Sequence, residues 1–167
     1  MSNFNSQKII APIMRFVNLK GIIALKDGML AILPLTVVGS LFLIIGQLPF
    51  EGLNQAIASV FGDTWTEPFM QVYSGTFAIM GLISCFSIGY SYAKNSGVEP
   101  LPAGVLSLSS YFILLKSSYV PAKGEPIGDA IAKVWFGGQG IIGAIIIGLV
   151  VGAIYTVFIQ RHIVIKM

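Results

Sequence analysis

Charged side chains are scarce in this 167-residue sequence. They make up only 10% of the residues, whereas hydrophobic residues make up 55% and the mean hydropathy is +0.84. A soluble domain carries about 25% charged residues to keep its surface hydrated, and a disordered chain combines low hydrophobicity with high charge. The composition therefore excludes both classes and indicates a protein surrounded by lipid.

Residues that carry catalytic or metal chemistry are also scarce. The sequence has one cysteine, Cys85, and one histidine, His162, which excludes a disulfide scaffold and a multi-cysteine metal site. It contains no phosphate-binding loop, zinc-protease motif or nucleophile elbow. Gly138, Gly140 and Gly143 match the dinucleotide pattern G-x-G-x-x-G, but no acidic residue follows them to bind a ribose. We therefore predict no catalytic residue, no metal site and no cofactor, and we assign no substrate-binding residue.

Four long stretches lack any charged residue. They cover residues 28–50, 68–93, 100–115 and 134–160. A transmembrane helix needs about 20 mostly apolar residues to cross about 30 Å of hydrocarbon. The sequence therefore predicts an all-α, polytopic integral membrane protein, with an N-terminal segment 1–27 and a transmembrane region 28–167 that spans at about 28–50, 68–93, 100–118 and 137–160. The third stretch is marginal in length, and a buried or re-entrant helix is its alternative.

The basic residues indicate the orientation. Lys8, Arg15, Lys20 and Lys26 precede the first span, whereas the following loop, 51–67, contains no lysine or arginine. The positive-inside rule therefore places the N-terminus in the cytoplasm. The ten basic residues fall into five separate clusters, so no nucleic-acid surface is predicted.

The segment 6–26 has the pattern of a basic amphipathic helix. One helical face carries Lys8 and Arg15, and the other carries apolar residues such as Ile9 and Phe16. Such a helix lies flat on an anionic inner leaflet, or it packs against the ends of other spans. Both interpretations place the segment at the cytoplasmic face.

Small residues recur every four positions in two of the predicted spans. Association between membrane helices depends on close packing, which such stripes allow. The pattern predicts tight helix contacts, within the chain or with a second copy. The predicted helix-packing residues are Gly81, Cys85, Gly89 and Ala93 in the second span and Gly140, Ala144, Gly148 and Gly152 in the fourth.

The polar content of the spans is uncharged. It consists of serines, threonines, tyrosines and the glutamines Gln47, Gln71 and Gln139. Ion-coupled carriers normally place ionisable groups at membrane depth, so this pattern argues against that class. The uncharged polar groups either bind a neutral, hydroxyl-rich ligand or form hydrogen bonds between helices.

Several segments are similar to a known family of membrane proteins. The segments are Leu-Lys-Asp-Gly-Met at 25–29, Ile-Leu-Pro-Leu-Thr-Val-Val-Gly-Ser at 32–40, Trp-Phe-Gly-Gly-Gln-Gly at 135–140 and the closing residues 161–167. They resemble the membrane-embedded IIC components of the bacterial phosphotransferase system, in the lactose/cellobiose/chitobiose group. The resemblance covers essentially the whole chain.

The resemblance implies a homodimer in the bacterial plasma membrane with a cytoplasmic N-terminus. It implies a subunit that translocates a β-linked disaccharide, which a soluble IIB component carrying a phosphocysteine phosphorylates. The resemblance also implies that the sugar-binding and catalytic histidine and glutamate of the family lie in its C-terminal half, and that its members are more than twice this length. The resemblance therefore implies an N-terminal half that provides scaffold and dimer interface, from a truncated product or a split gene. The alternative is a self-associating membrane anchor or assembly protein without transport activity.

The charge pattern and the predicted spans give a testable topology. Reporters fused after Asp63, Asn95, Gly124 and Met167 are expected outside, inside, outside and inside, respectively. Accessibility of each reporter in intact cells measures this pattern. A different result at the last two positions would contradict the prediction that the third stretch spans the membrane.

Overall fold

The structure is a computed structural model that describes residues 19–115, 118–119, 127–128 and 131–161. Most of the predicted amphipathic segment, residues 6–18, and the closing residues that include His162 lie outside the described residues. The described residues are helical or connecting, apart from one two-residue antiparallel pairing between β1 (Ser118–Tyr119) and β2 (Ile127–Gly128). The predicted all-α fold class is confirmed.

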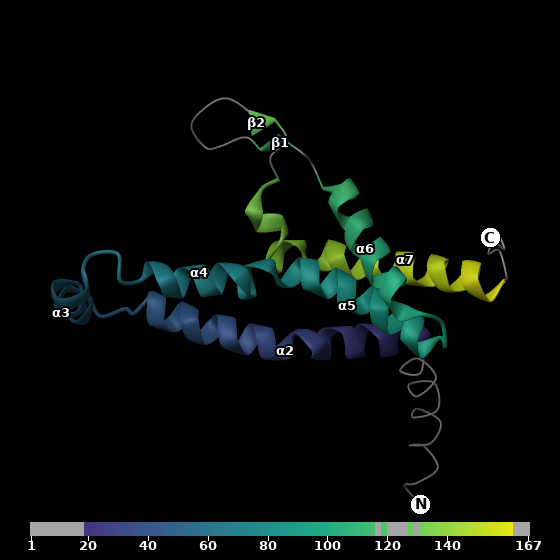
Figure 1. The fold of residues 1–167 in the computed structure, drawn as a ribbon, viewed down its shortest axis with the longest axis horizontal. Helices are drawn as coiled ribbons and strands as arrows, with labels where there is room; N and C mark the ends of the chain where they lie inside the picture. Colours follow the sequence, from purple (N-terminus) through teal and green to yellow (C-terminus); the bar gives the residue numbers. More distant parts are fainter. Residues whose placement is uncertain (1–18, 116–117, 120–126, 129–130, 162–167) are drawn as a thin grey trace, which may run out of the picture.

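Within the described residues, six α-helices and three short 3-10 helices follow one another. They are α2 (Lys20–Gly46), α3 (Glu51–Phe61), α4 (Glu67–Gly75), η1 (Phe77–Ile79), α5 (Met80–Asn95), α6 (Pro100–Leu114), η2 (Lys133–Trp135), η3 (Gly138–Gly140) and α7 (Ile141–Gln160). In Figure 1, α2, α7 and the consecutive helices α4 and α5 extend along the long axis. Helix α6 is inclined to them, and α3 lies at one end.

In the part of the chain that the structure describes, three segments are long and apolar enough to cross a membrane. They are Lys20–Gly46, Glu67–Asn95 and Gly138–Gln160, whereas Pro100–Leu114 is a shorter apolar helix. At about 1.5 Å per residue, the 15 residues of α6 extend for only about 22 Å, less than the hydrocarbon thickness of about 30 Å. The membrane crossing by this third stretch stays a prediction.

Helix α2 starts before the first predicted span. It begins at Lys20 and continues without interruption through Gly28, so Lys20 and Lys26 belong to the same helix as the apolar stretch. No proline interrupts the chain between 20 and 28, and an established helix extends at little cost. The described structure therefore shows no helix boundary at 27/28, where the sequence analysis divided the chain.

The second predicted span is two helices and not one. Helix α4 ends at Gly75, and Thr76 has a backbone conformation outside the helical region, with φ −125° and ψ −87°. The hydroxyl of Thr76 donates a hydrogen bond of 2.6 Å to the carbonyl oxygen of Val72, one of the groups left without a helical partner at this end. The loop before this span also contains α3, a helix that the charge pattern did not reveal.

Helix α5 is the centre of the bundle, and α2 approaches it along glycines. A Cβ added at Gly28 would lie 2.7 Å from a side-chain carbon of Ile88, and one at Gly39 would lie 2.8 Å from the backbone nitrogen of Phe77. Gly28 therefore meets the later residue Ile88, and Gly39 meets the earlier residue Phe77. This order of contacts shows that α2 runs antiparallel to the second span. Large side chains at these two positions would keep the helices apart.

The buried core is small, and large apolar side chains cover the outside of the bundle. The buried residues include Ala24, Ile32, Cys85 and Ile88. Many leucines, isoleucines and valines of α2 and α7 are about half exposed. A soluble protein rarely exposes such extended apolar surface, so this surface is consistent with contact to lipid.

Candidate functional site

The two predicted stripes of small residues contact each other inside one chain. A Cβ added at Gly148 would lie 2.8 Å from the carbonyl oxygen of Cys85, and one at Gly152 would lie 3.2 Å from that of Gly89. The separation along the sequence is the same in both pairs, so α5 and α7 are parallel neighbours. We call this contact between α5 and α7 the small-residue seam.

The remaining members of the stripes lie on or next to the seam. Ala93 and Ala144 are fully buried. Gly81 faces the segment before α7, where its N–H donates a 2.7 Å hydrogen bond to the carbonyl oxygen of Phe136. Gly140 lies against the carbonyl oxygen of Trp135, without space for a side chain. The structure therefore brings all eight predicted packing residues to the interior of one chain.

Helix α6 is joined to the seam by hydrogen bonds from small side chains and one tyrosine. The thiol of Cys85 donates to the carbonyl oxygen of Ser107 at 3.2 Å. The hydroxyl of Tyr111, which is 2% exposed, lies 2.6 Å from the carbonyl oxygen of Trp135 and 3.1 Å from that of Gly140. These contacts bring the last turn of α6 to the beginning of α7.

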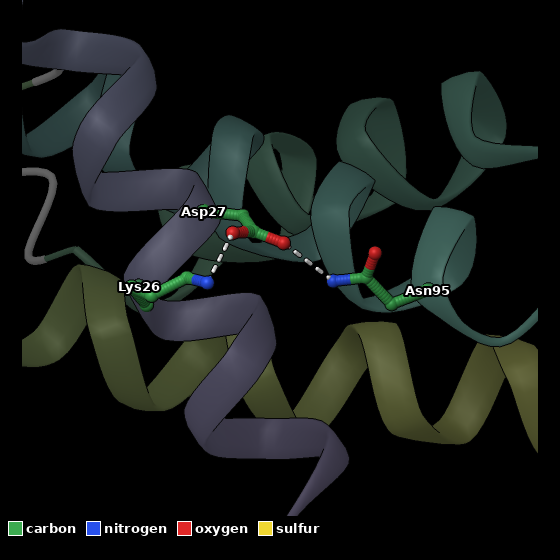
Figure 2. Close-up of polar contacts among 3 residues, drawn as sticks. All are labelled: Lys26, Asp27 and Asn95. Atoms are coloured by element: carbon green, nitrogen blue, oxygen red, sulfur yellow. Dashed lines mark hydrogen bonds and ion pairs between the residues drawn. The ribbon is translucent and has the colours of Figure 1, made fainter. Parts of the chain in front are cut away.

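A group of polar side chains joins α2, α5 and α7 at one end of the bundle. Figure 2 shows Asp27 between Lys26 and Asn95. A carboxylate oxygen of Asp27 lies 3.3 Å from Lys26 Nζ, and the other accepts a 2.9 Å hydrogen bond from the Asn95 amide. The side-chain amide of Gln160 donates to the carbonyl oxygen of Ser96 at 3.0 Å. These contacts hold the helix ends together.

The same end also contains a cavity and several basic residues. The cavity of about 380 Å³ is lined by side chains that include Asp27, Ser91 and Lys94. Lys20 begins α2, and Arg161 follows the end of α7. Basic residues of three segments that are far apart in the sequence therefore gather at the predicted cytoplasmic end.

A larger cavity lies where two helix interruptions meet. Residues 76–79 interrupt the second span, and residues 133–140 precede α7 as short 3-10 turns. A Cβ added at Gly137 would lie 3.1 Å from the carbonyl oxygen of Ala78, so the two interrupted segments cross in close contact. The cavity beside this crossing has a volume of about 610 Å³, and we call it the break pocket.

The break pocket combines an aromatic pair with uncharged and basic hydrogen-bonding groups. Tyr73 and Phe77 are stacked with their ring centroids 5.7 Å apart, and both rings line the pocket. The ammonium group of Lys133 donates a 2.8 Å hydrogen bond to the hydroxyl of Ser74, and Gln139 lines the same cavity. The described residues that line this pocket include no carboxylate.

Sequence reasoning counted the polar residues of the pocket that lie in the predicted spans without grouping them. Tyr73, Ser74 and Gln139 belonged to the uncharged polar content, and the structure places them at this pocket, whereas Gln47 and Gln71 are exposed elsewhere. Lys133 was missed. Glycine next to a β-branched residue at 75–76 and the glycines at 137–140 were signals for the two interruptions.

Two buried serine hydroxyls form hydrogen bonds within their own helices. Ser84 donates to the carbonyl oxygen of Met80 at 2.6 Å, and Ser107 donates to that of Ala103 at 2.8 Å. Among the described residues, no group of three or more histidine, cysteine, aspartate or glutamate side chains is placed to hold a metal ion. The polar chemistry of the described residues is therefore concentrated in the break pocket and at the basic end.

The fold and these contacts define a polytopic helical membrane protein with helix interruptions beside a cavity. The family model of the phosphotransferase system EIIC component matches residues 26–167. The chain belongs to this family, and the resemblance found in the sequence is confirmed.

The chain is similar to several known members. It is 39% identical over 150 residues to the lichenan permease IIC component of Bacillus subtilis, a match that covers 86% of this chain and 33% of the relative. It is 36% identical to the cellobiose-specific EIIC component of Geobacillus stearothermophilus, with the same coverage. The crystal structure of ChbC, the IIC component of an N,N'-diacetylchitobiose-specific phosphotransferase system, matches with a TM-score of 0.87 at 30% identity, covering 99% of this chain and 39% of that one. The chain spans about a third of the length of these relatives.

The small-residue seam predicts that alanine substitutions at two glycines of α7 have different effects on stability. A methyl group at Gly148 would meet backbone at 2.8 Å, whereas one at Gly143 would make an ordinary contact of 3.8 Å with Tyr111. Overpacking costs about 1–3 kcal/mol, and alanine gains about 1 kcal/mol over glycine in a helix. We expect Gly148→Ala to lower the thermal unfolding midpoint in detergent and Gly143→Ala to leave it unchanged or raise it. Equal midpoints for the two variants would contradict the seam.

Proposed function

We propose that this chain forms the scaffold of the membrane-embedded, sugar-translocating subunit of a phosphotransferase system, for a β-linked disaccharide of the cellobiose, lactose or chitobiose type. The match to the ChbC structure over nearly the whole chain carries this proposal. The names of the similar proteins support the substrate class, since lichenan, cellobiose and N,N'-diacetylchitobiose are β-linked saccharides. The soluble IIB component is the expected source of the phosphoryl group.

The described residues are suited to a scaffold more than to the transfer chemistry. Accepting a proton from a sugar hydroxyl requires a positioned general base, which is typically a histidine or a carboxylate. Asp27, beside the basic end, is paired with Lys26 and Asn95, and the break pocket has no carboxylate among its described lining residues. We assign the transfer chemistry to the part of the relatives beyond the matched third.

The parallel arrangement of α5 and α7 supports four membrane crossings. Gln160 contacts Ser96 at the end of both helices, and at their other end Gly81 in the first turn of α5 contacts Phe136, which precedes α7. A chain that leaves α5 at one end must return to the opposite end before α7 begins. Helix α6 makes most of this return, because its first turns lie beside the middle of α5, where Ala103 faces Gly89, and its last turn reaches Gly140.

The gathering of basic residues supports the orientation in the bacterial plasma membrane. Lys20, Lys26, Lys94 and Arg161 lie at the end where α5 and α7 finish, and lysine and arginine favour the cytoplasmic side. We therefore place the N-terminus and this end in the cytoplasm, and α3 and the break pocket toward the outside.

A homodimer would use a face of the bundle other than the small-residue seam. The stripes of small residues were predicted to pack within the chain or against a second copy, and the seam is filled by contacts between α5 and α7 of the same chain. Large apolar residues instead follow one exposed face of α2 at spacings of three or four residues. They are Leu30, Leu33, Val37, Leu41 and Ile44, each about half exposed or more.

The spacing on α2 distinguishes it from the other exposed helix face. An average repeat near 3.5 residues keeps one seam facing a partner helix, as in a coiled coil. On α7 the exposed residues Ile142, Ile146, Val150 and Ile154 recur every four positions, so the row winds around the helix. We assign α2 to the dimer interface and this row of α7 to lipid or to further helices.

The proposed function is tested by complementation in a bacterial host that lacks cellobiose uptake by this system. The chain is co-expressed with the C-terminal two thirds of the Geobacillus stearothermophilus cellobiose component and the soluble components. We expect cellobiose uptake and phosphorylation with both parts, and little or none with either part alone. Uptake should fall with Gly148→Leu and remain with Gly52→Leu, which adds a side chain in open space.

Two results of this experiment would contradict the proposal. Full uptake by the 167-residue chain alone would contradict the assignment of the transfer chemistry to other residues. Stable self-association in the membrane without uptake in any combination would favour the alternative, a membrane anchor or assembly protein.

The dimer is tested by cysteine cross-linking in membranes. The native Cys85 is fully buried and is therefore expected to stay unreactive. Val37→Cys on the α2 face should form a disulfide-linked dimer under mild oxidation, whereas Ile146→Cys on α7, with the same exposure, should form little. Gel mobility without reductant measures the product. Cross-linking through position 146 and not through 37 would contradict the assigned face.

A further inference from the structure

The break pocket lies beside backbone that is not helical, which is unusual at membrane depth. Backbone that is not helical leaves polar N–H and carbonyl groups without partners, and lipid cannot satisfy them. Such backbone is tolerated where protein buries it or where it lines a water-filled cavity. Here the crossing at Ala78 and Gly137 buries part of it, and the cavity of about 610 Å³ lies directly beside. Interrupted helices in transporters frequently form substrate sites.

The groups in the pocket are suited to a neutral, hydroxyl-rich ligand. The ammonium group of Lys133 has three N–H donors and uses one toward Ser74. The amide of Gln139 and the hydroxyl of Tyr73 both donate and accept. A pyranose ring presents hydroxyls around its edge and C–H groups on its faces, so it can pack on the Tyr73–Phe77 pair while its hydroxyls reach these polar groups.

The lining also argues against other ligand classes. A cation would meet Lys133 without a compensating carboxylate from the described residues that line the pocket. A purely apolar ligand would leave the ammonium and amide groups without partners, which costs free energy. The volume lies within the range of about 300–1,000 Å³ that is typical for small-molecule sites, so a disaccharide fits.

We infer that the break pocket is a binding site for a β-linked disaccharide on the outer side of the bundle, formed entirely by this chain. The inference rests on the proposed function for the identity of the sugar and for the outward direction. It adds a sugar contact at the junction of α4, η1 and the segment 133–140, distant from the basic end where Asp27 and Asn95 lie. A sugar arriving from outside would meet this pocket before it reaches the cytoplasmic side.

The site is tested by calorimetric titration of cellobiose into the full chain purified in detergent. Gly138→Leu should fill the pocket without disturbing its walls, because a Cβ at Gly138 meets no atom within 4 Å. Lys133→Met should remove a donor and keep most of the side-chain volume. We expect cellobiose binding at least tenfold weaker in each variant, with unchanged helix content and elution volume.

Matched control variants separate the pocket from general effects of the substitutions. Gly52→Leu adds the same side chain in open space on α3, and Lys94→Met removes a lysine from the cavity at the opposite end. Both should bind cellobiose like the unaltered chain. We expect no binding of inorganic phosphate to the pocket. The titration with phosphate should therefore give the same result for the unaltered chain and for Lys133→Met.

Three results would overturn the site. They are the absence of cellobiose binding by the unaltered chain, unchanged binding in Gly138→Leu, and a pocket that binds phosphate in place of cellobiose. A chain that binds no cellobiose but supports uptake in the complementation experiment overturns the site alone. Binding that depends on the pocket, without uptake in any combination, overturns the proposed function alone.

Discussion

Close backbone contact between α5 and α7 is the constraint on which the other contacts of this bundle depend. At Gly148 and Gly152 no side chain separates the two helices, and the carbonyl groups of Cys85 and Gly89 lie directly opposite. In lipid the hydrophobic effect contributes little to the association of two helices, since lipid tails are as apolar as leucine. Dispersion contacts between closely packed atoms must provide the attraction, and they decrease steeply with distance.

This contact determines the position of the neighbouring segments. Two parallel helices require the chain to return between them, so α6 runs beside them and ends where the Tyr111 hydroxyl meets the backbone before α7. The residues that precede α7 are then held against the start of α5 by the hydrogen bond from Gly81 to Phe136. They meet the interruption at Thr76, and the break pocket forms beside this crossing. The pocket and the seam are therefore consequences of one packing arrangement.

Much of the architecture could be predicted from residue order alone. The uncharged stretches indicated helices in lipid because an unpaired backbone group in hydrocarbon costs several kcal/mol. The four-residue spacing of small residues indicated tight packing. The interruption at Thr76 was missed because residues 68–93 read as one continuous apolar run. Helix α3 was missed because the loop was analysed for its charges and not for its periodicity. The spacing left open whether the stripes pack within the chain or against a second copy, and in the structure they face each other.

The sequence by itself determined the solvent of this protein, the approximate position of its helices and its family, because these depend on composition and on local order. Only the tertiary structure decided which surfaces meet. Gly148 could have faced a second copy as well as Cys85, and nothing near Lys133 in the sequence indicates that its ammonium group reaches Ser74. Such pairings depend on the direction in which distant helices approach, and that direction is set by the complementarity of two surfaces and not by either one alone.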